Sequence, residues 1–179
     1  MSATYGGKGG YDDECRFYGK YRGQVADNDD PYDVGRVQVI CPPLLGEGNA
    51  SWAMPSMPYA GKNVGLFAVP PIGANVWVEF EAGDLDYPIW SGCFWGDRSE
   101  VPTSPPDATT KVFKTDVFTL TVDDTSGSGS VTLELASPVN PIKLRMLLSS
   151  SIIELSAGAA KIALGPATVS LNDGALEVL

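Results

Sequence analysis

The sequence predicts an all-β protein in which a small antiparallel barrel precedes a slender stack of very short strands. Two observations carry this prediction. The C-terminal third repeats one short period-2 pattern, and residues 16–96 hold alternating apolar runs separated by proline and glycine. No segment shows a sustained helical period, so no helix is predicted. At 179 residues, the chain has room for one ordinary domain plus an appendage.

The repeated pattern is an aliphatic residue, any residue, and a second aliphatic residue. Its copies start at steps of 11, 9, 9, 7 and 7 residues, which leaves room for tight turns and none for a helix. Strands this short bury little on their own, and their open edges would pair with other chains. Identical chains that wind together, three of them for instance, would cover every edge, so the pattern predicts a core that is completed by copies of the chain. The predicted trimer core is formed by the aliphatic positions of the pattern: Leu133, Leu135, Leu144, Met146, Ile153, Leu155, Ile162, Leu164, Val169, Leu171, Leu176 and Val178.

The interior of such a needle is predicted to be narrow and dry. No aromatic residue occurs from Thr119 to Leu179, because three rings would not fit in one layer of a slim core. Burying each leucine or isoleucine would contribute roughly 1.5–3 kcal/mol. Twelve such positions in each of three chains would offset much of the entropy lost when the strands become ordered.

The barrel is predicted within residues 16–96, which contain all four tryptophans. Prolines mark the ends of its strands, since proline cannot sit in a central ladder. The clearest strand places Val76, Val78 and Phe80 on one face. The strand candidates are residues 18–26, 35–41, 51–54, 65–68, 74–81 and 89–95. Residues 1–15 are expected to be a flexible leader, residues 97–110 a Pro/Ser/Thr-rich linker, and residues 111–179 the spike.

Composition narrows the classes of function. The net charge is -10, of which residues 1–110 carry -8, so binding to nucleic acid is disfavoured. The polar, glycine-rich start does not resemble a signal peptide, and no apolar run has the length of a membrane span. Three scattered cysteines fit neither a disulfide framework nor a zinc site, and they are compatible with synthesis in a reducing cytoplasm.

No catalytic, cofactor-binding or metal site is predicted. Without a histidine, neither the serines nor the cysteines can form a histidine-assisted nucleophile. Asp84 and Asp86 are interpreted as turn residues. Residues 27–30 with Asp33 lack the spacing of a helix-loop-helix calcium site and are interpreted as a solvated acidic loop. The tryptophans are assigned to the barrel core; a binding platform at Trp52 or Trp95 would require exposure of the ring.

Four blocks of sequence resemble the contractile-tail central spike family, which comprises phage baseplate assembly protein V and the spike portion of VgrG proteins. Residues 35–42 resemble its opening strand, and residues 51–61 resemble the segment that follows. Residues 71–84, followed by Pro88-Ile89, resemble its most specific signature, a Pro-x-x-Gly turn, an alternating strand and Gly-Asp. Residues 114–125 resemble the start of the needle. The resemblance implies an OB-fold barrel followed by an intertwined trimeric β-helix, over roughly residues 18–179.

The resemblance also implies a function and partners. The chain would be the non-enzymatic homotrimeric central spike of a phage tail baseplate or a phage-derived injection particle, assembled in the cytoplasm. It would sit beneath a baseplate hub supplied by another polypeptide and would contact the target cell envelope transiently as the sheath contracts. Without histidine it cannot build the iron-bearing tip of some relatives, so a separate PAAR-like tip protein is expected at Leu176, Val178 and Leu179.

Two other classes of function stay open at this point. Trimeric β-helices also occur in polysaccharide-degrading tail proteins, which need paired carboxylates in an aromatic groove. An OB-fold could instead bind single-stranded nucleic acid, against the acidic charge of residues 1–110.

Overall fold

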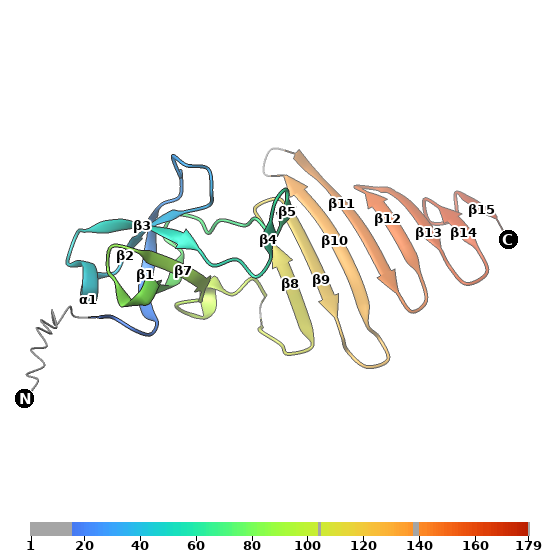
Figure 1. The fold of residues 1–179 in the computed structure, drawn as a ribbon. Helices are drawn as coiled ribbons and strands as arrows, with labels where there is room; N and C mark the ends of the chain where they lie inside the picture. The colour runs from blue at the N-terminus through green and yellow to red at the C-terminus, as the bar shows by residue number, and fades with distance from the viewer. Residues whose placement is uncertain (1–15, 104, 138–139, 179) are drawn as a thin grey trace, which may run out of the picture. The chain divides into compact units, whose positions relative to one another are not determined.

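The computed structural model describes residues 16–103, 105–137 and 140–178, and it is nearly all β (Figure 1). The chain divides between Gly96 and Asp97 into two compact units. The predicted leader, residues 1–15, lies outside the described residues. No helix in the described part of the chain is long and apolar enough to cross a membrane.

The N-terminal unit is a closed five-stranded barrel, consistent with the predicted OB-fold. The strands follow one another around the barrel in the order β1-β2-β3-β7-β6, with β3 and β7 parallel and the other pairs antiparallel. Their bounds are β1 Tyr21–Asp27, β2 Val37–Ile40, β3 Ala50–Pro55, β6 Asn75–Phe80 and β7 Pro88–Cys93.

The barrel core is built from the inward positions of alternating strands. Val76 and Val78 in β6 are fully buried and Phe80 nearly so, as the sequence predicts. Val37 and Val39 of β2 are also fully buried. Gly23 in β1 has no room for a side chain, because a Cβ atom there would lie 2.7 Å from Cγ2 of Val78.

Two details of the predicted barrel are wrong. A single helical turn, α1 (Pro42–Leu45), follows β2 where no helix was expected; its two prolines at the N-terminal positions need no amide partner. The strand predicted at residues 65–68 is absent beyond Gly65. Short 3-10 turns, η1 (Glu81–Gly83) and η2 (Arg98–Glu100), complete the helical content of the described residues.

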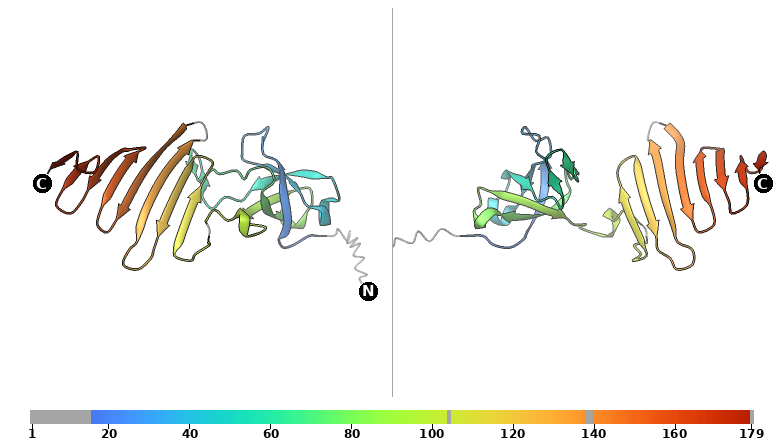
Figure 2. Two further views of the ribbon diagram at one scale, coloured as in Figure 1. Left: turned by 180° about the vertical axis from the view of Figure 1, so that it is seen from behind. Right: turned by 45° about the vertical axis from the view of Figure 1, so that its right-hand side comes forward.

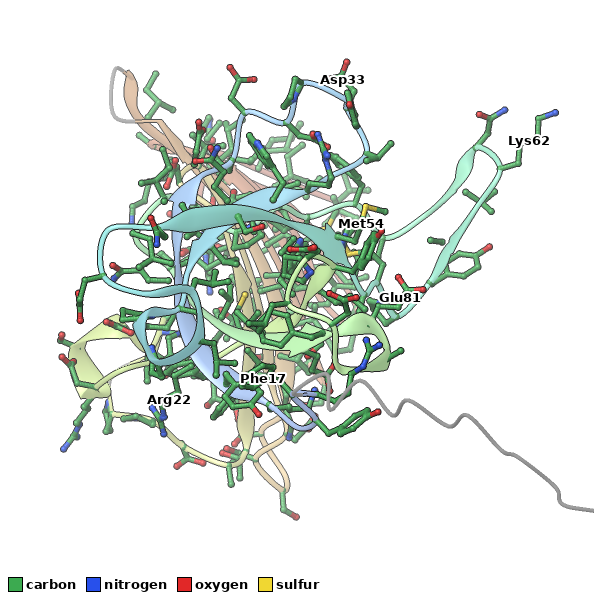
Figure 3. All side chains as sticks on the ribbon, turned by 60° about the vertical axis from the view of Figure 1, so that its left-hand side comes forward. Phe17, Arg22, Asp33, Met54, Lys62 and Glu81 are labelled. Carbon is green, nitrogen blue, oxygen red and sulfur yellow. The ribbon has the colours of Figure 1, made fainter. Side chains whose placement is uncertain are left out.

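A two-stranded hairpin leaves the barrel between β3 and β6. It consists of β4 (Ala60–Gly61) and β5 (Val64–Gly65), joined by Lys62-Asn63, and we call residues 59–67 the arm. Figure 3 shows the arm projecting from the barrel with Lys62 at its tip.

The C-terminal unit is one antiparallel sheet in which each strand pairs with the next along the chain, from β8 to β15 (Figure 2). The bounds are β8 Thr110–Lys114, β9 Phe118–Asp123, β10 Ser130–Ser137, β11 Asn140–Ser149, β12 Ile153–Ala157, β13 Ala160–Leu164, β14 Val169–Leu171 and β15 Leu176–Val178.

The strands shorten toward the C-terminus, from ten residues in β11 to five in β12 and β13 and three in β14 and β15. The sequence predicts the later strands at the repeated pattern. It misses β8, which starts at the end of the predicted linker, and it underestimates β11, where Leu147 and Leu148 interrupt the alternation.

Candidate functional site

One face of the C-terminal sheet is apolar across seven consecutive strands. In an antiparallel sheet, directly paired residues point to the same side, so the register identifies the members of each face. The central row contains one residue from each strand β9–β15: Leu120, Leu133, Met146, Leu155, Ile162, Leu171 and Leu176.

Two further rows flank the central row on the same face. The first contains Val122, Val131, Leu148, Ile153, Leu164, Val169 and Val178. The second contains Phe118, Leu135, Leu144, Ala157 and Ala160. We call the three rows together the apolar face.

All twelve residues of the predicted trimer core lie on the apolar face. The sequence reasoning missed the seven other members: Phe118, Leu120, Val122, Val131, Leu148, Ala157 and Ala160. Extending the period-2 alternation backward from Leu133 would have identified Val131, and the alternation of residues 118–122 contains the other three N-terminal members. Leu148 was hidden because Leu147 beside it is also aliphatic.

The apolar face is open within a single chain. Leu135, Leu155, Ile162 and Leu164 each expose between 42% and 46% of their surface. A groove of about 610 Å³ runs over the face; among its lining residues are Phe118, Leu133, Met146, Leu155 and Leu171. Contiguous apolar surface of this kind marks an interaction site in a soluble protein.

The opposite face of the same sheet is charged. Arg145 lies 3.7 Å from Glu134 and 3.4 Å from Glu154 on the neighbouring strands, and Lys161 lies 3.7 Å from Glu154. Asp173 also pairs with Lys161 and raises the pKa of that lysine. Each of these partly exposed ion pairs contributes little to the free energy of folding, roughly 0.2–1 kcal/mol. Their charges indicate that this face of the sheet is in contact with solvent.

The last strand leaves an edge and two aliphatic side chains exposed. Among the described residues, β15 pairs only with β14, and Leu176 and Val178 are 56% and 59% exposed. Leu179, the third predicted tip contact, lies outside the described residues. A short strand with a free edge can accept a partner by adding backbone hydrogen bonds.

The acidic segment at residues 27–33 differs from the predicted solvated loop. Asp30 is buried and pairs with Arg36 at 2.7 Å. The amides of Tyr32, Val34 and Arg36 donate to its carboxylate at 3.0–3.1 Å. The carboxylate is therefore a structural anchor for the loop. In the described part of the chain, no group of three or more acidic or cysteine side chains is placed to hold a metal ion.

Asp84 lies in the turn that joins β6 and β7, as predicted. Its carboxylate accepts from the amide of Asp86 at 3.0 Å, the pattern of an Asx turn, and it also pairs with Arg16. The Asx turn is local structure, and the contact with Arg16 joins this turn to the segment before β1.

The tryptophans occupy different environments. Trp90 is buried in the barrel core and its indole N–H donates to the carbonyl of Gly35 at 3.2 Å. Trp52 and Trp77 are half-buried, with Arg36 and Arg22 respectively stacked 5.2 Å from their rings. Trp95 is 61% exposed, so the prediction that the tryptophans form the core is wrong for this residue.

Relatives that share part of this sequence are spike proteins of type VI secretion systems. VgrG5 of Pseudomonas aeruginosa is 34% identical over 73 residues, covering 40% of this chain and 9% of the relative. VgrG3 of Vibrio cholerae is 31% identical over 112 residues, covering 56% of this chain and 11% of the relative. The chain thus spans about a tenth of the length of these curated relatives.

Two family models match the two structural units separately. The type VI secretion system/phage-baseplate injector OB domain matches residues 21–95, which contain the barrel. The phage baseplate V C-terminal trimerisation domain matches residues 110–177, which contain β8–β14, the first two residues of β15 and all of the apolar face except Val178. Both units occur in the expected order, and the chain belongs to the central spike family of phage baseplates and type VI secretion systems.

Proposed function

We propose that this chain forms the homotrimeric central spike of a contractile tail or injection machine and helps to puncture the target envelope when the sheath contracts. The observation that carries the proposal is the contrast between the two faces of the C-terminal sheet. One face presents three aliphatic rows and the other presents paired charges. Three copies of this sheet would bury the apolar faces against one another and keep the charged faces in water.

The proposed work of the spike is mechanical and needs no catalytic residue. Each strand pairs with its sequence neighbours, and closure by three chains would add side-chain packing between sheets. Bending or unfolding the spike at any one point would then require breaking contacts in all three chains at once. The two families matched by the chain are structural, which supports a non-enzymatic role.

The proposed partners bind different units of the chain. A baseplate hub would hold the barrel unit, in keeping with the description of the matched N-terminal domain as part of a phage-baseplate injector. A tip protein of the PAAR-like class would seat on Leu176 and Val178, the exposed aliphatic side chains of β15, and on Leu179. The assembled particle would be a virion tail baseplate or a related injection particle.

Light scattering on the purified chain tests the trimer directly. We expect a mass of three times 18.9 kDa at micromolar concentration. A monomer at that concentration would contradict the proposal, because a spike that separates into single chains cannot transmit force along its axis.

A further inference from the structure

The arm exposes a cluster of large apolar side chains on the barrel unit. Tyr59 is 62% exposed, Val64 54%, Leu66 51% and Phe67 71%. A hairpin of two short strands is marginal in water by itself. An arm of this composition therefore needs a surface to cover it.

The segment that contains the arm is almost free of charge. Between Glu47 and Glu79, Lys62 is the only charged residue, in a chain whose net charge is -10. Part of this stretch is barrel strand β3 and the start of β6, but the exposed residues of the arm are also depleted in charge, which is typical of the buried centre of an interface. The composition indicates that the arm is covered in the assembled protein.

The shape of the arm is held by its own backbone. The amide of Leu66 donates to the carbonyl of Tyr59 at 2.9 Å, closing the hairpin at its base. Gly65 has φ of 154°, and a Cβ atom there would lie 2.8 Å from that same carbonyl oxygen. The conformation of the hairpin therefore requires glycine at position 65.

The arm also forms one wall of a groove. The groove has a volume of about 660 Å³, and Val34, Pro55 and Met57 of the barrel are among the residues that line its other side. Most of the residues that line the groove belong to the arm itself, and Val34, Pro55, Ser56 and Met57 supply the rest. A contact between the arm of one copy and these four residues of another copy would join two different surfaces, and such a heterologous contact closes into a ring when the rotation between copies fits.

We propose that the arm of each protomer seats in the groove of the next protomer, so that the three barrels form a closed ring. This inference rests on the proposed homotrimer. The occupant is a second copy of this chain, because the C-terminal trimerisation domain would hold three barrels together at an effective concentration in the millimolar range. Even a weak arm contact is then saturated, and it adds a second trimer interface that does not involve the apolar face of the C-terminal sheet.

Photo-crosslinking of the full chain tests the proposal. Tyr59 is replaced by the photoreactive amino acid p-benzoylphenylalanine, and Tyr87 is replaced in a matched control. Both tyrosines lie on the barrel unit and are 62% and 61% exposed, but Tyr87 is outside the arm and the groove. We expect at least tenfold more covalently linked chains from position 59 than from position 87, with the linked peptides containing Val34 or Met57. Mixing isotopically light and heavy chains before assembly identifies linkages between chains.

The outcomes separate this inference from the proposed trimer. A protein that is trimeric by light scattering but gives no linkage between chains at position 59 overturns the arm exchange and leaves the trimer standing. A monomeric protein overturns both. Adding Leu66→Ser to the Tyr59 variant is expected to reduce the linkage at least fivefold without changing the trimeric mass; an unchanged yield would also overturn the arm exchange.

Discussion

Asp30 anchors the loop between β1 and β2. Its carboxylate accepts three backbone amides and pairs with Arg36, whose guanidinium lies 4.0 Å from the ring of Tyr32 and 5.2 Å from that of Trp52. The Arg36 side chain and the amides favour the charged carboxylate and hold its pKa well below the ordinary value of 3.8. One short acidic side chain therefore fixes the loop and the exposed aromatic residue beside it.

Replacing Asp30 with Asn is expected to lower the melting temperature of the barrel by about 5 °C or more, because Arg36 and the amides lose their anionic acceptor. Asp33→Asn is the matched control. Asp33 is exposed and has φ of 54°, a conformation that asparagine also tolerates, so its melting temperature should not change. Differential scanning calorimetry measures both; equal melting temperatures would contradict the role assigned to Asp30.

The ion pair between Asp30 and Arg36 predicts that the stability of the barrel depends on pH. A carboxyl whose pKa is lowered by folding stabilises the protein fully above the unfolded pKa of about 3.8, and this contribution is lost as the pH falls through the lower folded pKa. Between pH 4 and pH 2, the stability of the barrel should therefore decrease less steeply in Asp30→Asn than in the wild type. Denaturant titrations across this range measure the two slopes.

At the scale of the element, the two faces of β12 make opposite predictions for neighbouring residues. Leu155→Asp places three carboxylates in the proposed interior and removes roughly 1.5–3 kcal/mol of apolar burial per chain, so trimers should not form. Ser156→Asp changes the adjacent position on the charged face, where Arg145 and Lys161 are its register partners, and it should leave the trimer intact. Light scattering compares the two variants; dissociation of both would mean that the faces are assigned incorrectly.

Most strands of the C-terminal sheet could be predicted from the sequence because the repeated pattern is local. Each copy alternates on its own, and pairing with the next copy needs only a short turn. β8 could not be identified in this way, since Lys111 and Lys114 of Thr110–Lys114 flank two adjacent apolar residues, which breaks the alternation, and the strand follows a proline-rich segment. The strand predicted at residues 65–68 failed because a mostly apolar run on an exposed arm resembles a core strand in composition.

The buried carboxylate was beyond sequence reasoning for a different reason. Asp30 stands among exposed acidic residues, and its burial depends on Arg36 and on backbone amides that a turn brings together. The members of the apolar face, in contrast, follow from alternation, although the sequence does not show that three rows line up across seven strands. That alignment is set by the register of each hairpin.

At the scale of the whole molecule, the two units are expected to separate cleanly. Deleting residues 131–179 removes β10–β15 and most of the apolar face, while the barrel core lies entirely within the N-terminal unit. The truncated protein should be monomeric and should keep its barrel. Near-UV circular dichroism checks the barrel, because all four tryptophans lie in the N-terminal unit and Trp90 is buried in the barrel core, and light scattering gives the mass. A truncated protein that stayed trimeric would assign trimerisation to the barrel.

The nearest-neighbour order of β8–β15 has a consequence for how needles of different length can arise. Since each strand of this sheet pairs only with the strands before and after it in the sequence, a hairpin inserted into a turn would lengthen the sheet without disturbing more than one pairing. The number of strands then sets the length of the sheet, whereas the length of each strand sets the width of the sheet at that strand. The length and the taper of the sheet can therefore evolve independently, the first by duplication of a hairpin and the second by shortening of a strand.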